Sequence, residues 1–286
     1  MLPDRLLLNR IIDGALAEDL AWGDLTTDSL VDSNQSGVGR MVAKEDGVLA
    51  GIEIAALAFT RVDENLVVDL AVADGCRLTP GKTLATVRGH VAGILRAERV
   101  SLNFVQRMSG IATATASYVA ATVGTAARIV DTRKTTPGLR ILEKYAVRVG
   151  GGVNHRFCLS DGVLIKDNHL AALRARGLGF SEAVSLARER VPHMVKIEVE
   201  VESLAEAREA LDAGADVILL DNMSPEEMRR CVDLIGGRAM TEASGGITLA
   251  TVRAAAESGV DLISVGALTH SIRALDISLD LEIEGR

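Results

Sequence analysis

The sequence has 286 residues, a formal net charge of −8, and 48% hydrophobic against 24% charged residues, with aromatic side chains at only 2%. This composition is typical of a globular protein with one large or two modest domains and an aliphatic core. No uncharged apolar run reaches the ~18 residues of a membrane span, and the amphipathic N-terminus predicts neither a signal peptide nor an anchor. The three unclustered cysteines favour a reducing cytoplasm and argue against a zinc site or a disulfide framework.

The first third of the chain is predicted to be a small α/β sandwich domain. Residues 3–18 form one amphipathic helix, and short alternating strands with glycine-containing turns follow it. A long apolar helix at residues 94–123 leads into the second part, with the boundary near residues 106–110. Residues 275–283 alternate between apolar and polar side chains, so we expect them to pair as a strand with this N-terminal part.

The second part repeats one unit, in which a short β-branched run ends in polar residues and a helical stretch follows. Ser203–Glu206 and Ser224–Glu227 are predicted capping boxes at the starts of two helices. The alternation favours an α/β barrel, and because only six strands are clear, we expect an incomplete barrel of six to seven strands. We place it at residues 108–269, and the N-terminal sandwich at residues 1–107, joined by the segment 270–286. The six runs lie at residues 127–134, 162–169, 195–203, 216–223, 239–246 and 261–270.

Charged residues and glycines follow the predicted strands. Ligands of α/β barrels bind at the C-terminal ends of the strands, and core packing does not require polar groups at the same place in six consecutive units. We therefore expect one binding site at these ends. The candidate residues are Arg133, Lys134, Lys166, Glu198, Glu200, Asp221, Ser244, Gly245, Gly246 and Gly266.

The segment from Asp131 to His169 carries seven Lys and Arg residues against four acids, in an otherwise acidic protein. That concentration of positive charge predicts a small polyanionic ligand, whereas the acidic remainder of the chain disfavours nucleic acid. Part of the charge has a plainer explanation. Arg140, Lys144 and Arg148 recur every four residues, which predicts a solvated helix face.

The other strand-end groups suit one kind of ligand. The Ser244–Gly246 turn offers backbone N–H groups to a phosphate, and arginine side chains match carboxylates or phosphates. Acids beside an anion site are repulsive unless they hold a divalent cation or accept hydrogen bonds from sugar hydroxyls, and Glu200 and Asp221 are such acids. Phosphate groups, a hydroxylated sugar and Mg²⁺ occur together in a phosphoribosyl diphosphate.

The chain resembles the quinolinate phosphoribosyltransferase family, also called carboxylating nicotinate-nucleotide pyrophosphorylases. The likeness is carried by DTRKT-x-PGLR-x-L-x-KYAVR-x-GGG-x-NHR at residues 131–156 and by LIKDNH, EVEVES, LLDN, EASGGI and VGALTH, and it extends from residue 18 to the C-terminus. It implies the type II phosphoribosyltransferase fold, an N-terminal open-faced α/β sandwich joined to an incomplete α/β barrel. It also implies a pentosyltransferase of de novo NAD biosynthesis, which converts quinolinate and 5-phosphoribosyl-1-diphosphate to nicotinate mononucleotide, diphosphate and CO₂.

The resemblance assigns roles to single residues. It implies that Lys134, Lys166, Glu200 and Asp221 are catalytic, and that the two acids meet the ribose hydroxyls and a Mg²⁺ ion held mainly through the substrate diphosphate. It implies that Arg99 enters the site from the partner subunit of a homodimer, so that active sites are shared; a higher assembly of dimers stays open. The implied substrate-binding residues are Arg99, Thr132, Arg133, Lys134, His155, Arg156, Lys166, Glu200, Asp221, Ser244, Gly245, Gly246, Val265, Gly266 and Ala267.

Three other functions stay under consideration. A paralogue that binds another anion, such as the molybdenum-transport-associated relatives, tends to lose part of the basic set. A nicotinate phosphoribosyltransferase acts on a single carboxylate, for which three arginines are more than the substrate needs. A non-catalytic anion-binding module leaves the acids Glu200 and Asp221 unexplained. The basic set is present here as Lys134, His155, Arg156 and Lys166.

Overall fold

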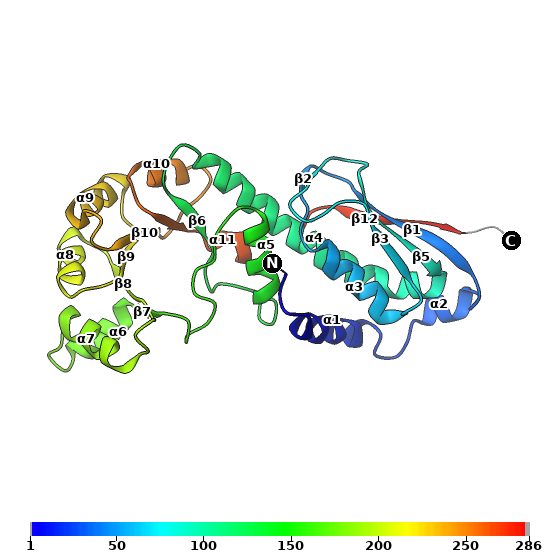
Figure 1. Cartoon of the computed structure of the whole chain (residues 1–286), viewed down its shortest axis with the longest axis horizontal. Helices are drawn as coiled ribbons and strands as arrows, with labels where there is room; N and C mark the ends of the chain where they lie inside the picture. Colours follow the sequence, from blue (N-terminus) through cyan, green and yellow to red (C-terminus); the bar gives the residue numbers. More distant parts are fainter. Residues whose placement is uncertain (1, 284–286) are drawn as a thin grey trace. The chain divides into compact units, whose positions relative to one another are not determined.

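Two units make up the part of the chain that the computed structural model describes, residues 2–283 (Figure 1). The first unit contains the chain up to Ala116, the segment Thr135–Gly151 and the residues from Leu268 onward. The second contains Ser117–Lys134 and Gly152–Ala267. In the described residues, no helix has both the length and the apolar character needed to cross a membrane.

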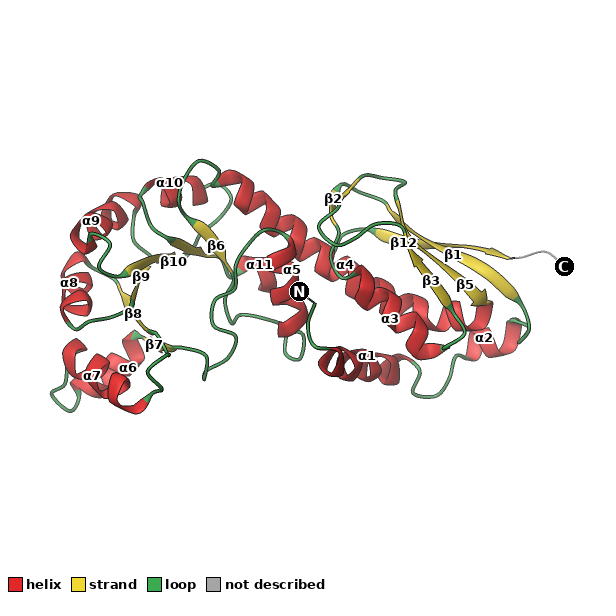
Figure 2. Cartoon of the chain, viewed as in Figure 1, coloured by secondary structure: helices red, strands yellow, loops and turns green. Residues whose placement is uncertain are grey.

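An antiparallel sheet of four strands, in the order β12-β1-β5-β3, forms the centre of the first unit (Figure 2). Half-buried and buried residues alternate along β1, so one face of this strand packs into the core. β12 pairs with β1, which confirms that residues near the C-terminus add a strand to the N-terminal part. The strands are β1 (Ser36–Ala43), β2 (Gly47–Val48), β3 (Val67–Leu70), β4 (Arg77–Leu78), β5 (Thr83–His90) and β12 (Ile277–Ile283).

Aliphatic side chains fill the core of the first unit, where helices α3 and α4 pack against the sheet. Phe59 of α3 is fully buried among them, beside Leu84 of β5 and Ile94 of α4. The predicted first helix begins after Asp4, whose carboxylate accepts a 2.9 Å hydrogen bond from the Leu6 N–H. The helices with residues in this unit are α1 (Arg5–Asp19), α2 (Leu25–Leu30), α3 (Ile52–Val62), α4 (Val91–Ala121), α5 (Arg140–Val149) and α11 (Ala267–His270).

Gly110 of α4 lets the C-terminal segment approach the helix closely. A Cβ atom at this position would lie 2.2 Å from the carbonyl oxygen of Arg273, a distance that no side chain tolerates. The segment continues past this contact, and the Leu275 N–H donates to the carbonyl of Gln106 at 2.9 Å. The absence of a side chain at residue 110 therefore helps to place the chain that leads into β12.

A parallel sheet in the order β6-β11-β10-β9-β8-β7 forms the second unit, and all six predicted strands are present. Figure 1 shows them as an arc with helices on its outer side. In the described residues no strand ladder joins β6 to β7, so the barrel is incomplete as expected. The elements are β6 (Arg128–Val130), β7 (Val163–Ile165), α6 (Asp167–Arg174), α7 (Phe180–Arg190), β8 (Ile197–Val201), α8 (Leu204–Asp212), β9 (Val217–Asp221), α9 (Pro225–Ile235), β10 (Met240–Ser244), α10 (Val252–Glu257) and β11 (Leu262–Ser264).

The two predicted capping boxes lie at the starts of α8 and α9 in the second unit. At Ser224 the box is complete, because Ser224 Oγ accepts from the Glu227 N–H at 3.3 Å and the Glu227 carboxylate accepts from the Ser224 N–H at 2.9 Å. At Ser203 only the serine half forms, since Glu206 accepts instead from the N–H of Glu202. α8 starts three residues after the end of β8, and α9 starts four residues after the end of β9, so only a short loop separates each strand from its helix.

The prediction of a solvated face on α5 is wrong for one of its three residues. Arg148 is exposed and Arg140 is half-buried, but Lys144 is only 1% exposed. The reason is that five of the ten residues of α5 are buried, so the buried face of the helix includes charged residues as well as apolar ones. Spacing by four residues identifies residues on one face of a helix, but it does not show how far the neighbouring elements cover that face.

Candidate active site

A cavity of about 420 Å³ lies at the C-terminal ends of the barrel strands in the second unit. Each of the six strands of the parallel sheet contributes to the cavity wall, either with its own residues or with residues that closely follow it. Nine of the thirteen lining residues are ones that the sequence predicted. The lining consists of Thr132, Arg133, Lys134, His155, Arg156, Leu164, Lys166, Glu200, Leu219, Asp221, Glu242, Ser244 and Ser264.

Much of the positive charge in this cavity comes from two short segments. Thr132, Arg133 and Lys134 follow β6, and the Lys134 N–H donates to Thr132 Oγ1 at 3.0 Å. Arg156 lies before β7 and donates from Nη1 to the carbonyl of Gly162 at 2.8 Å. Burial lowers the pKa of Arg156, and the nearby Arg133 lowers it further. Because two partly buried guanidinium groups repel each other, this part of the cavity favours a bound carboxylate or phosphate.

Acidic side chains stand on neighbouring strand ends of the same cavity. Glu200 of β8 forms an ion pair with Lys166, which directly follows β7. Asp221 ends β9 and accepts a 2.6 Å hydrogen bond from Asn222 Nδ2. Asn222 has a left-handed backbone, with φ of 53°, which turns the chain at the cavity edge. The cavity therefore offers both positive groups for anions and carboxylate oxygens of the kind that Mg²⁺ prefers.

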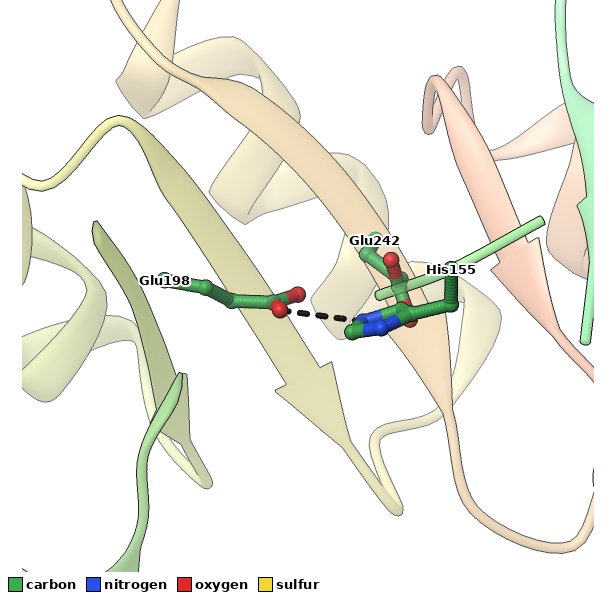
Figure 3. Close-up of side chains that lie close together, drawn as sticks. All are labelled: His155, Glu198 and Glu242. Atoms are coloured by element: carbon green, nitrogen blue, oxygen red, sulfur yellow. Dashed lines mark ion pairs between the residues drawn. The ribbon is translucent and has the colours of Figure 1, made fainter. Parts of the chain in front are cut away.

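A buried cluster of His155, Glu198 and Glu242 adjoins the charged groups (Figure 3). His155 Nε2 lies 3.0 Å from Glu198 Oε2 and 3.6 Å from Glu242 Oε1. Glu242 is only 1% exposed, and burial raises its pKa to about 8, with Glu198 acting in the same direction and His155 in the opposite one. At neutral pH Glu242 is therefore mainly a neutral carboxylic acid.

The predicted phosphate-binding turn follows Ser244, which lines the cavity. Gly245 and Gly246 both have left-handed backbones, with φ of 90° and 60°. A Cβ on Gly245 would lie 2.2 Å from Asn222 Oδ1, so the turn requires glycine at that position. The residues at these two strand ends that do not line the cavity are Gly245, Gly246, Val265, Gly266 and Ala267.

Arg99 is not among the residues that the second unit brings together. It belongs to the first unit, on α4, and its side chain is exposed to solvent. Its predicted role in a shared site therefore remains a prediction.

The sequence reasoning missed four lining residues, although the alternation of β-strands identifies three of them. Side chains two residues apart share one face of a strand. Leu164 precedes Lys166 by two residues, Leu219 precedes Asp221, and Glu242 precedes Ser244. The fourth missed residue is Ser264, which ends β11.

Models of known protein families match both parts of the chain. The model described as quinolinate phosphoribosyl transferase, N-terminal domain, matches residues 24–109, and that of the C-terminal domain matches residues 111–280. The boundary between the two matches lies inside α4.

Individual proteins similar to this chain support the same assignment. A probable nicotinate-nucleotide pyrophosphorylase (carboxylating) from Bacillus subtilis (strain 168) is 46% identical over 280 residues, which cover 98% of this chain and 95% of that protein. The nicotinate-nucleotide pyrophosphorylase (carboxylating) of Mycobacterium leprae (strain TN) is 46% identical over 93% of this chain and 94% of its own. The crystal structure of NadC from Streptococcus pyogenes has a TM-score of 0.95 and 42% identity, with 100% of both chains covered. This chain therefore belongs to the quinolinate phosphoribosyltransferase family.

Proposed function

We propose that this protein is a decarboxylating quinolinate phosphoribosyltransferase. It joins quinolinate to 5-phosphoribosyl-1-diphosphate and yields nicotinate mononucleotide, diphosphate and CO₂, a step of NAD biosynthesis. The observation that carries the proposal is that Arg133, Lys134 and Arg156 line the same cavity as Glu200 and Asp221. The curated relatives from Bacillus subtilis and Mycobacterium leprae carry the carboxylating name.

The basic groups of the cavity solve the problem of holding two anionic substrates together. Quinolinate is a dicarboxylate and the ribose donor carries phosphates, so the two repel each other in water. Arg133 and Arg156 offer planar pairs of N–H donors that suit carboxylates, whereas Lys134 and Lys166 offer compact charges for the diphosphate. Holding both substrates in one cavity makes the bond-forming step effectively unimolecular.

The acids act on the ribose part of the donor. As the ring nitrogen of quinolinate attacks C1 of the ribose and diphosphate leaves, positive charge develops on the sugar. Glu200 and Asp221 supply negative charge beside it and accept hydrogen bonds from its hydroxyl groups. Lys166, which is paired with Glu200, is placed to neutralise the departing diphosphate.

The donor set also fits a magnesium ion. Glu200 and Asp221 provide hard carboxylate oxygens, and Mg²⁺ is commonly held by one or two carboxylates together with substrate phosphates. When bound, the ion would polarise the diphosphate and so make it a better leaving group.

We further propose that the enzyme works in the cytoplasm as a homodimer whose active sites are shared. The three cysteines are free, which is consistent with a reducing compartment. Arg99 is an exposed cation on α4, outside the unit that holds the cavity, and such a group is available to enter the site of a partner subunit.

The test of the proposed function compares quinolinate with nicotinate as substrate. With phosphoribosyl diphosphate and Mg²⁺, the purified protein is expected to release CO₂ and form nicotinate mononucleotide from quinolinate. A parallel binding titration is expected to show tighter binding of the dicarboxylate. Product from nicotinate at a comparable rate, with none from quinolinate, would refute the proposal. Binding of neither compound would favour a paralogue for another anion.

A further inference from the structure

Glu242 is a carboxyl group of the cavity that the binding steps proposed above do not use. Its side chain contributes to the cavity wall although the residue is only 1% exposed. The residues opposite it in the sheet are Leu219 of β9 and Leu262 of β11, both apolar. In the described part of the chain, no backbone N–H and no lysine or arginine donates to its carboxyl oxygens. A carboxylate buried in this way is disfavoured, so the neutral acid is the stable form.

The neighbouring His155 shows where the protons of the cluster lie. Its Nδ1 accepts a 2.8 Å hydrogen bond from the Arg156 N–H, so the proton of the neutral ring is on Nε2. Nε2 faces Glu198 at 3.0 Å and Glu242 at 3.6 Å (Figure 3). In this tautomer Nε2 is the donor, and it faces the carboxyl groups of Glu198 and Glu242.

The groups around Glu242 keep its proton in place at neutral pH. Burial is the largest cause of the raised pKa of about 8, and the carboxylates of Glu198 and Asp131 raise it further. His155 acts in the opposite direction, as does the nearby hydroxyl of Ser264. Because the folded-state pKa is raised, the acid form dominates below about pH 8 and is lost as the pH rises above that value.

On the basis of the proposed function, we propose that Glu242 is the general acid that donates the proton replacing the carboxylate lost from C2 of the pyridine ring. Once the ring nitrogen carries the ribose, the bond between C2 and its carboxylate breaks and CO₂ leaves. The electron pair stays on C2, stabilised by the adjacent positive nitrogen. As this electron pair develops, the Glu242 O–H bond breaks and the C2–H bond forms, before CO₂ can recombine with C2. Net loss of CO₂ therefore depends on the proton transfer, and Glu242 remains as a carboxylate that recovers a proton from water.

The experiment separates the two halves of the reaction in single turnovers, with enzyme in excess over quinolinate and both diphosphate and CO₂ measured after quenching. Wild-type enzyme is expected to release the two products together. In Glu242→Gln, diphosphate release is expected to stay close to wild type, whereas CO₂ release slows by about 10²-fold or more, the usual contribution of a positioned acid. The ribosylated dicarboxylate should accumulate in this variant. Glu242→Asp, which keeps an acid, is expected to restore part of the CO₂ release.

Glu226→Gln serves as the matched control, because Glu226 is exposed on α9. It should leave both products unchanged. Release of CO₂ in step with diphosphate at the wild-type rate in Glu242→Gln would overturn the proposal, and so would an equal loss of both products. Failure of the wild-type protein to release diphosphate from quinolinate and the ribose donor would instead refute the proposed function, so the two failures are distinguishable.

A second measurement needs no variant and so does not depend on how well Glu242→Gln folds. In wild-type enzyme the rate of CO₂ release is expected to fall as the pH rises through about 8, while diphosphate release follows a different profile. A CO₂-release rate that is unchanged well above this pH would show that Glu242 is not the proton donor.

Discussion

At the scale of single residues, the effect of removing a charge is expected to depend on whether that charge lies in the cavity wall. Lys134 and Lys196 are both exposed, but Lys134 follows β6 in the cavity wall, whereas Lys196 lies just before the start of β8, at the opposite end of the strands. This pair allows a comparison of like side chains, because both are lysines that differ in position relative to the ligand.

Lys134→Ala is therefore expected to lose much more activity than Lys196→Ala. Removal of a charge that binds a desolvated anion costs about 2–5 kcal/mol, against less than about 1 kcal/mol for an exposed charge that contacts no ligand. Steady-state kcat/KM with quinolinate measures the difference. Similar losses in the two variants would show that Lys134 does not bind substrate.

The acids are expected to affect one substrate and not the other. Glu200→Gln and Asp221→Asn should weaken binding of phosphoribosyl diphosphate with Mg²⁺, because their negative charge acts on the ribose and the metal. The dissociation constant of quinolinate should change little. Titration calorimetry with each substrate separates the two effects, and a many-fold rise in the quinolinate constant would contradict the assignment.

The sequence predicted the charged residues of the cavity better than it predicted burial. Arg133 and Lys166 were predictable because each follows a short apolar run and carries a charge that packing of the core does not explain. Burial of Lys144 was not predictable, because it depends on contacts made by the whole width of α5. Glu242 was hidden for a related reason: a carboxyl group inside a strand pattern gives no sign that its pKa is raised by burial.

At the scale of elements, glycine at residue 110 determines how closely α4 and the C-terminal segment pack. Gly110→Ala is expected to lower the free energy of unfolding by about 1–3 kcal/mol, because the added Cβ overlaps the carbonyl of Arg273. Urea unfolding followed by circular dichroism measures this change.

Gly14→Ala is the matched control for that substitution. Gly14 also lies within a helix, α1, and a Cβ there meets nothing within 4 Å. Alanine is a better helix former than glycine by up to about 1 kcal/mol, so this variant is expected to be slightly more stable. Destabilisation of both variants to the same extent would show that the contact with Arg273 is not the cause.

All six strands of the parallel sheet could be predicted, because each is a short apolar run bounded by turn or cap signals. Their exact ends could not, and the observed strands are shorter than the predicted runs. The alternation of side chains between the two faces of a strand predicts the cavity-lining residues better than the position of the strand's last residue does. Leu219 and Glu242 became visible as lining residues only when the strand faces were assigned.

At the scale of the whole molecule, the shared active site has a direct test by complementation. Arg99→Ala and Lys134→Ala are each expected to be nearly inactive alone. In a mixed dimer one site carries both defects and the other is intact, so random subunit exchange should restore about a quarter of wild-type activity. Activity is measured after mixing under conditions of demonstrated exchange. An absence of recovery would place Arg99 outside a partner's site.

The pairing of β12 with β1 also bears on how the protein is made. Translation produces β1 early, but its partner at residues 277–283 is synthesised only after the complete barrel sequence. On the ribosome, the edge of β1 that later carries β12 is therefore without its native neighbour while the intervening chain emerges, and unpaired strand edges invite wrong pairings. The parallel sheet, in contrast, has all its strands between residues 128 and 264. Vectorial synthesis thus favours a nascent chain in which the barrel acquires its sheet first and the antiparallel sheet is completed last.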